Sequence, residues 1–279
     1  GNTFKDVPPF STMLHGERQN YGTFKIMGWQ QTVTTLDQVL PAIQSLLKYL
    51  AAHPETAKAI ALKLGRRFVE DVPSQQFISD IAASYTSSGG DIKATLQAVY
   101  KHSDFKSAIG KKLKRPGEDY ISVARSLDVF PDFTRLQKWP GVTRGFDFPA
   151  IVANELKGMG HAPLSWPFPD GYPDVATHWV NASYQVVRWN VYRHFVLGNT
   201  WNPPSWETLL AVRETNLDKQ IDQVSQLLLF KELGSADRIS VRNAITKAFG
   251  ANPDLNNSYR DITVLIARLI FQLPVWSLR

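Results

Sequence analysis

The chain has 279 residues, enough to bury a large hydrophobic core in one domain or two. A hydrophobic content of 43% and a charged content of 20% exclude a disordered chain, and the absence of cysteine excludes disulfides, thiolate metal sites and a cysteine nucleophile. The net charge of +6 is spread along the chain, so we expect no nucleic-acid surface. The longest apolar run, 262–271, is broken by Arg268 and is too short to cross a membrane.

Residues 1–34 show no sustained period and predict an irregular wrapping segment of loops or short strands. The chain opens at Gly1 without a starting Met, so we expect a fragment of a longer protein. The remainder, 35–279, is predicted to form a single helical domain. Its apolar residues recur every three or four positions from Leu36 onward, with Pro41 inside the pattern, which predicts a helix that begins near this proline or is kinked there.

Residues 54–70 predict a helix with its own start and stop. Pro54 suits the first helical turn, and Pro73 forbids continuation. Ser74 and Asp91 are the expected N-caps of the next two helices. One face of the 54–70 helix carries its apolar side chains, namely Ala57, Ile60, Ala61, Leu64 and Phe68.

Two segments interrupt the helical spacing of apolar residues. Residues 130–149 are rich in proline and glycine and predict either a sub-lobe boundary or a long surface crossing. Residues 161–178 contain four prolines, a spacing that no helix can cross, whereas the aromatic residues among them favour an ordered loop over a disordered one.

Helices are expected again in the C-terminal part of the chain. Their predicted ranges are 182–197, 205–215, 217–233, 237–249 and 258–272, with Gly234 and Gly250 as C-caps and Ser205, Asp237 and Ser258 as N-caps. The sequence therefore predicts an all-α fold, a multi-helix orthogonal or irregular bundle with two long ordered loops.

Standard local motifs nominate no enzyme class. The sequence has no GxxxxGK[ST] phosphate loop, no dinucleotide fingerprint, no GxSxG elbow and no HExxH. Whether the protein is an enzyme is therefore left open, and no cofactor is predicted. Asp170 and Asp174 are too few carboxylates to indicate a calcium ion, so no metal site is predicted either.

Candidate polar residues precede and end the 54–70 helix. His15, Lys25 and His53 are candidates for a base or ligand, with a loop hydrogen bond or a capping role as the alternative. Arg66 and Arg67 could bind an anion or a polymer, or could instead stabilise the helix end and pair with the acidic residues that follow. Because adjacent helical residues point about 100° apart, at most one of the two arginines can face the core.

Aromatic density is the strongest compositional anomaly, since six of the eight tryptophans lie between Trp139 and Trp206. Aromatic faces beside a few polar groups could stack sugars or bind a peptide, or could pin the proline-rich loop onto the helices. The candidate binding residues of this region are Trp166, Asp170, Tyr172, Trp179 and Arg188.

Several blocks of the sequence occur together and in a fixed order. Residues 53–73 contain His-Pro-x-Thr-Ala, then Lys-Leu-x-Arg-Arg-Phe-Val, then Asp-x-Pro. Residues 112–118 contain Lys-x-Lys-x-Pro-x-Glu, and residues 171–173 are Gly-Tyr-Pro. These blocks resemble an uncharacterised bacterial family, the domain of unknown function catalogued under the number eighteen hundred.

The resemblance covers most of the chain, but only the later portion of a full-length member. It implies an exported protein, periplasmic or secreted, because members are often predicted to be exported and are often encoded beside a second, sulfatase-like family. It carries over no catalytic residue. We therefore expect a non-catalytic domain that binds a polysaccharide or the co-encoded protein through the 161–190 surface. The alternative is a hydrolase-like enzyme, whose site is shared with the missing N-terminal half and in which His15, Lys25, His53 and Arg67 converge.

Overall fold

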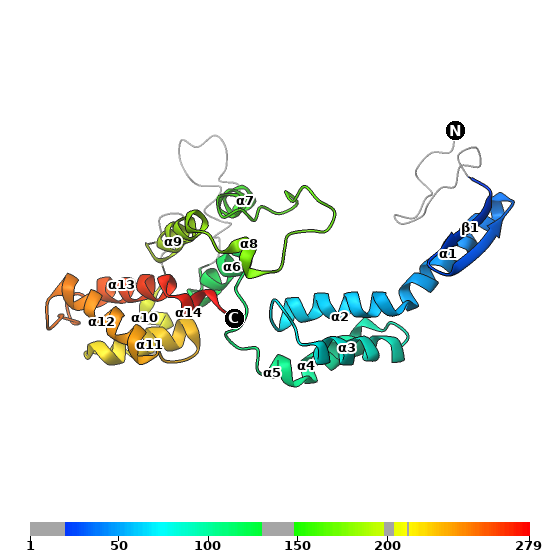
Figure 1. The fold of residues 1–279 in the computed structure, drawn as a ribbon. Helices are drawn as coiled ribbons and strands as arrows, with labels where there is room; N and C mark the ends of the chain where they lie inside the picture. Colours follow the sequence, from blue (N-terminus) through cyan, green and yellow to red (C-terminus); the bar gives the residue numbers. More distant parts are fainter. Residues whose placement is uncertain (1–19, 130–147, 198–203, 211) are drawn as a thin grey trace, which may run out of the picture. The chain divides into compact units, whose positions relative to one another are not determined.

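The computed structural model describes residues 20–129, 148–197, 204–210 and 212–279. The described residues are mostly helical with one two-stranded sheet, which confirms the predicted all-α class (Figure 1). The chain divides into two compact units, one formed by residues 1–65 and 73–104 and the other by residues 66–72 and 105–279. Most of the segment 130–149 lies outside the described residues, so the sub-lobe boundary expected there stays a prediction.

The first unit opens with an antiparallel hairpin of strands β1 (Gly22–Ile26) and β2 (Trp29–Val33). The two residues of its turn, Met27 and Gly28, both have positive φ values, 50° and 93°. This conformation matches the twist of the two strands. Short strands are therefore present in the part of segment 1–34 that the structure describes.

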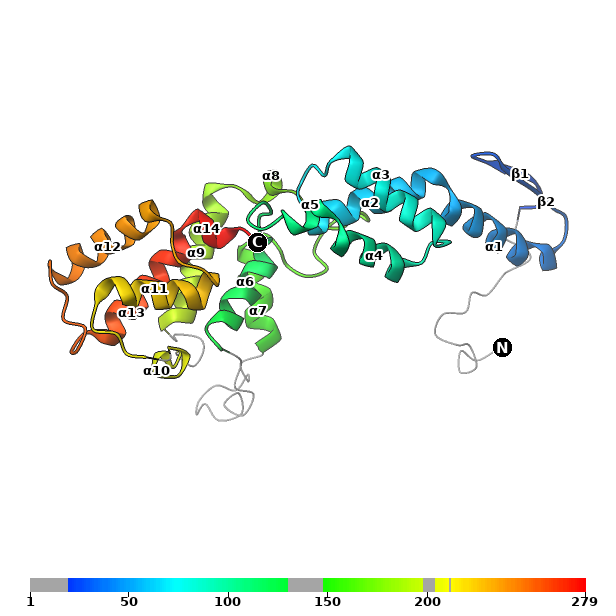
Figure 2. The same ribbon diagram turned by 90° about the horizontal axis from the view of Figure 1, so that it is seen from below.

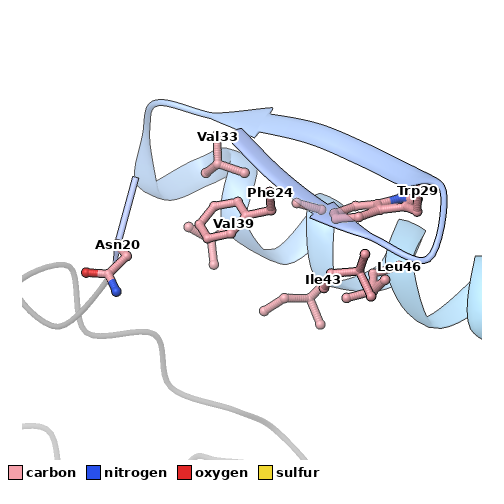
Figure 3. Close-up of a pocket in the computed structure, with 9 residues that line it drawn as sticks. Asn20, Phe24, Trp29, Val33, Val39, Ile43 and Leu46 are labelled. Carbon is pink, nitrogen blue, oxygen red and sulfur yellow. The ribbon is translucent and has the colours of Figure 1, made fainter. Parts of the chain in front are cut away.

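Helix α1 (Leu36–Ala52) packs against β2 and buries Val39 and Ala42 with Val33. The hairpin and α1 line a shared apolar cavity of about 350 Å³. Figure 3 shows side chains of both elements pointing toward one another. Pro41 lies inside α1, so the helix begins before the proline and forgoes one backbone hydrogen bond.

The remaining helices of the first unit begin and end where the sequence indicates. Helix α2 (Pro54–Phe68) ends before Pro73, and its last residues pass into the second unit. The predicted N-caps are confirmed, because Ser74 accepts a hydrogen bond from the Phe77 N–H (3.0 Å) and Asp91 accepts from Lys93 and Ala94. These caps begin helices α3 (Gln75–Ser87) and α4 (Ile92–Lys101), which are followed by the short α5 (Ser103–Lys106).

The second unit is built around α13 (Tyr259–Gln272), which contacts α9 (Ala182–Leu197), α11 (Leu217–Leu229) and α12 (Ser235–Phe249) (Figures 1 and 2). Six of its side chains are completely buried at the centre of the core, namely Ile262, Thr263, Ile266, Ala267, Ile270 and Phe271. The other helices of this unit are α6 (Pro116–Ser126), α7 (Phe148–Gly158), α8 (Ala176–Trp179), α10 (Trp206–Leu209) and α14 (Pro274–Ser277). No helix among the described residues is long and apolar enough to span a membrane.

Three local predictions in this unit are wrong. The helix expected at 205–215 is only the single turn α10, because Leu210 is extended. Helix α11 ends early, since Phe230 adopts a left-handed conformation (φ 58°). Gly234 is accordingly the N-cap of α12 rather than a C-cap, and Asp237, expected as that N-cap, lies in the first turn.

Candidate functional site

The proline-rich segment 161–180, here called the aromatic loop, is ordered by contacts between its own rings. The rings of His161, Tyr172 and Trp179 contact one another, with centroids 4.7, 5.0 and 5.8 Å apart. Trp166 extends this group through contacts with Tyr172 (4.9 Å) and His178 (5.3 Å). Two of these five pairs, His161 with Tyr172 and Trp166 with His178, are edge-to-face, a favourable geometry for aromatic rings. The expectation of an ordered loop is confirmed.

The polar groups of the two tryptophans and of Tyr172 form hydrogen bonds within the loop itself. The indole N–H of Trp166 donates to Asp170 (2.9 Å), and that of Trp179 donates to the Pro173 carbonyl (2.9 Å). The Tyr172 hydroxyl donates to the Ala162 carbonyl (2.9 Å). The aromatic side chains therefore hold the loop in one conformation. This agrees with the alternative that these rings pin the proline-rich loop in place.

Two backbone N–H groups help to attach the aromatic loop to other elements of the second unit. The Gly117 N–H, in the first turn of α6, donates to His161 Nδ1 (3.0 Å). The Ala176 N–H, at the start of α8, donates to the Asp71 carboxylate (2.6 Å). The loop is therefore fixed both to α6 and to the segment that follows α2.

Beside this loop lies an ionic cluster that joins four separate parts of the sequence. Its members are Arg67, Asp71, Lys112, Arg115, Glu118, Asp174 and Arg279.

Glu118 is the hub of the cluster. It forms ion pairs with Arg67, Arg115 (3.0 Å) and Arg279 (3.3 Å), and it accepts the Arg115 N–H at the start of α6 (3.1 Å). Burial alone would raise its pKa, but the hydrogen bonds from Arg67 and the Arg115 backbone, with the nearby Arg279 charge, hold the pKa of Glu118 below its usual value.

Lys112 is the second centre, with a side chain only 3% exposed. Its ammonium group lies 2.6 Å from the Asp71 carboxylate and 3.2 Å from that of Asp174, and it donates to the Asp174 carbonyl. Burial would raise the pKa of Asp71, but the hydrogen bonds from Lys112 and the Ala176 N–H lower it. Asp174 is thus paired with cations of the chain itself, which leaves it poorly placed to hold calcium.

An apolar cavity of about 640 Å³ opens next to the cluster and the aromatic loop. Its polar lining residues are Arg115, Glu118, Arg125, His161 and Tyr172. The rest of its lining is mostly apolar and comes from α6, α7, α9 and the loop, including Tyr120, Ile121, Ala124, Val152, Leu156, Leu164 and Phe195. A cavity of this size, with a few polar groups in a mostly apolar lining, is typical of a ligand-binding site.

His161 at this cavity is held in its neutral form. Burial, together with the nearby Arg115 charge, lowers the pKa of the imidazole. Because Nδ1 accepts the Gly117 N–H, the proton of the neutral ring is on Nε2. His161 can therefore donate a hydrogen bond but cannot take up a proton at Nδ1 without losing its contact to α6, which disfavours a role as general base.

The candidate arginines of α2 separate as their helical spacing predicts. Arg67 is half-buried and belongs to the ionic cluster, whereas Arg66 is exposed. Arg67 pairs with Glu118 and Asp174 rather than with the acidic residues that directly follow the helix.

The remaining N-terminal candidates lie in the first unit. Lys25 is exposed on β1, and His53 accepts the Glu55 N–H at the start of α2 (3.2 Å), the capping role considered for it. His15 and Trp139 lie outside the described residues. Convergence of His15, Lys25 and His53 with Arg67, which is in the other unit, stays a prediction, and so does the enzyme that depends on it.

Arg188 lies in a second buried group that sequence reasoning largely missed. The completely buried Asp119 accepts hydrogen bonds from the Tyr192 hydroxyl and the Trp276 indole (2.8 Å), and it lies 3.5 Å from the Arg188 guanidinium. Burial raises the pKa of Asp119, although each of these partners favours the charged form. No group of three or more metal-ligating side chains occurs in the part of the chain that the structure describes.

Comparison with known protein families assigns almost the whole chain to one of them. The family described as "Protein of unknown function (DUF1800)" matches residues 9–278 of the chain. This chain belongs to the DUF1800 family. No curated protein and no solved structure matches it. In this DUF1800 chain, Arg67 and Asp71 of the first block, Lys112 and Glu118 of the second and Asp174 directly after Gly-Tyr-Pro meet in one cluster.

Proposed function

We propose that this chain is a binding domain, and that the apolar cavity beside the aromatic loop receives apolar side chains of a partner protein. The observation that carries the proposal is the clamped loop, whose rings and ionic anchors give the cavity a fixed wall. Leu164 and Ile121 line the cavity and are strongly exposed to solvent. Exposed apolar side chains around a preformed cavity are typical of protein-binding sites.

A polysaccharide fits this surface less well. Sugars stack on open aromatic faces, but Trp166, Tyr172 and Trp179 pack against one another, and Trp179 is buried. Their polar groups also donate within the loop, so few are left for sugar hydroxyls. The partner that the family resemblance implies is the co-encoded, sulfatase-like protein.

The proposal includes export to the periplasm or beyond, which is supported by the family resemblance alone. Cell fractionation of the full-length gene product in its own host tests this part. Recovery in the periplasmic or extracellular fraction supports export, and recovery in the cytoplasmic fraction contradicts it.

The binding site can be tested with two matched isoleucine variants. Ile121 on α6 and Ile239 on α12 are both 57% exposed, but only Ile121 lines the cavity. Short random peptides are selected against the wild-type chain, and the affinity of the selected peptides is measured by fluorescence anisotropy. We expect Ile121→Glu to weaken binding by at least about tenfold, because it places a charge at an apolar contact, and Ile239→Glu to leave it within about threefold.

Equal effects of the two variants would contradict the proposal, and so would a failure to select any peptide. Purified envelope polysaccharides are titrated in parallel while tryptophan fluorescence is followed. A saturable response that Ile121→Glu leaves unchanged would also contradict the proposal, because it would assign the surface to sugars.

A further inference from the structure

A separate cavity of about 410 Å³ lies at the start of α9. It is lined by Leu113, Trp179, Val180, Asn181, Ala182, Gln185 and Arg188. Trp179 and Val180 belong to the aromatic loop, but none of the seven residues lines the apolar cavity. Val180 is 67% exposed, so this part of the lining faces solvent. Arg188 contributes the one charged side chain among the lining residues.

The guanidinium of Arg188 is only partly satisfied by the chain. Arg188 is 1% exposed, and its Nη1 lies 3.5 Å from Asp119. Its Nε and Nη2 have no hydrogen-bond partner among the described residues. These two nitrogens form one edge of the planar guanidinium, and their N–H groups point in parallel toward the same side. A buried charged donor without a partner is costly, so this free edge indicates a missing acceptor.

Asp119 is not that acceptor. The Arg188 Nη1 lies 3.5 Å from Asp119, whereas Nε and Nη2 donate to neither of its carboxylate oxygens, which accept from Tyr192 and Trp276. A second cation also lies near Asp119, because the half-buried Lys114 donates to the Trp276 carbonyl (2.7 Å) and lies over the Trp276 ring. Lys114 also interacts with the charge of Glu118, so the positive charge that the chain leaves unpaired at this site is that of the Arg188 edge.

We propose that the cavity at Arg188 binds an oxyanion, a carboxylate or a phosphate group, which takes two hydrogen bonds from the free Nε–Nη2 edge. Two adjacent oxygens of such a group match this edge in a bidentate pair. The Asn181 side-chain oxygen accepts the Tyr184 N–H (2.8 Å), which leaves its amide NH₂ as a further donor. Leu113 and Trp179 supply apolar surface for the remainder of the ligand.

The test uses sodium benzoate, sodium acetate and sodium phosphate at constant ionic strength, with sodium chloride as the reference. The ¹H–¹⁵N signal of the Arg188 Nε–H, assigned by its loss in Arg188→Lys, reports occupancy directly. We expect a saturable shift with at least one of the three oxyanions and none with chloride. A higher affinity for benzoate than for acetate indicates a carboxylate ligand with an apolar body. A higher affinity for phosphate than for either carboxylate indicates a ligand that bears a phosphate group.

Because Arg188→Lys can also disturb Asp119, a second pair of variants keeps the buried pair intact. Ala182 is exposed and lines the cavity at the first turn of α9. Ala182→Glu supplies a competing carboxylate, and Ala182→Gln matches its size without the charge. We expect Ala182→Glu to weaken oxyanion affinity by about tenfold or more, and Ala182→Gln to change it by less than about threefold. The proposal is overturned if no oxyanion shifts the Arg188 signal. It is also overturned if Ala182→Glu and Ala182→Gln bind the oxyanion with equal affinity.

Discussion

Asp71 and Ala176 are 105 residues apart in the sequence, and the Asp71 carboxylate accepts the Ala176 backbone N–H at 2.6 Å. The other oxygen of Asp71 pairs with the buried Lys112 ammonium at 2.6 Å. One carboxylate thus connects the segment after α2 to the loop before α6 and to the end of the aromatic loop. This arrangement explains how a proline-rich segment with little regular structure becomes a fixed wall of the apolar cavity.

Loss of the Glu118 charge is expected to destabilise the second unit strongly. Glu118→Gln leaves three guanidinium groups facing one another around a mostly buried position, at an expected cost of about 2–4 kcal/mol in the free energy of unfolding. The matched control is Asp218→Asn, because Asp218 pairs with Arg242 at a surface position where both side chains are 44% exposed. Its expected cost is below about 1 kcal/mol. Urea unfolding of both variants measures the difference, and equal costs would show that the cluster is not a structural hub.

Two glycines, one directly before the aromatic loop and one within it, distinguish the cost of backbone strain from the cost of packing. Gly160 and Gly171 have nearly the same positive φ, 75° and 76°. A Cβ at Gly160 would lie 2.6 Å from the Tyr184 ring, whereas a Cβ at Gly171 would meet nothing within 4 Å. Gly171→Ala should cost only the left-handed strain, about 1 kcal/mol, and Gly160→Ala should cost at least about 2 kcal/mol more, since a ring must move. Thermal unfolding of both variants measures this order, and the reverse order would contradict the packing described for Tyr184.

Lys114 is expected to make stability increase in mildly alkaline solution. Burial lowers its pKa from 10.5 to about 8, so between these values the unfolded chain binds more protons than the folded chain. The free energy of unfolding should therefore rise with pH in this window, by an amount on the order of 1 kcal/mol between pH ~7.5 and ~9.5. Lys114→Met removes this titration and should flatten the profile. Urea unfolding at the two pH values measures the slope, and an unchanged slope in the variant would assign it to another group.

Local features of the fold could be predicted from the sequence because their causes are local. Ser74 and Asp91 cap the helices that follow them, and Pro73 lies beyond the end of α2. The helix ending at Phe230 could not be predicted in the same way. Its left-handed residue is a phenylalanine, and the nearby Gly234, a residue typical of helix ends, begins the next helix instead.

The candidate site was predictable only in part, since its partners come from distant positions. The 3.6-residue period correctly separates Arg67 from Arg66, but Glu118 lies 51 residues after Arg67. Nothing in the local pattern indicates this pair, although both residues belong to the family's blocks. For the aromatic loop, the sequence left open whether the rings bind sugars or hold the loop. Only the ring contacts and the hydrogen bonds of Trp166, Tyr172 and Trp179 favour the second role.

The proposed binding site depends most directly on the aromatic loop being fixed in solution. Amide hydrogen exchange measures whether it is. In the wild-type chain we expect the hydrogen-bonded amides of His161, Ala176 and Val180 to be protected to a degree comparable with α6, the Ala176 N–H by its bond to Asp71. In Asp71→Asn we expect faster exchange around Ala176, while α13 keeps its protection. Exchange of 161–180 at the rate of an unstructured peptide in the wild-type chain would contradict the account.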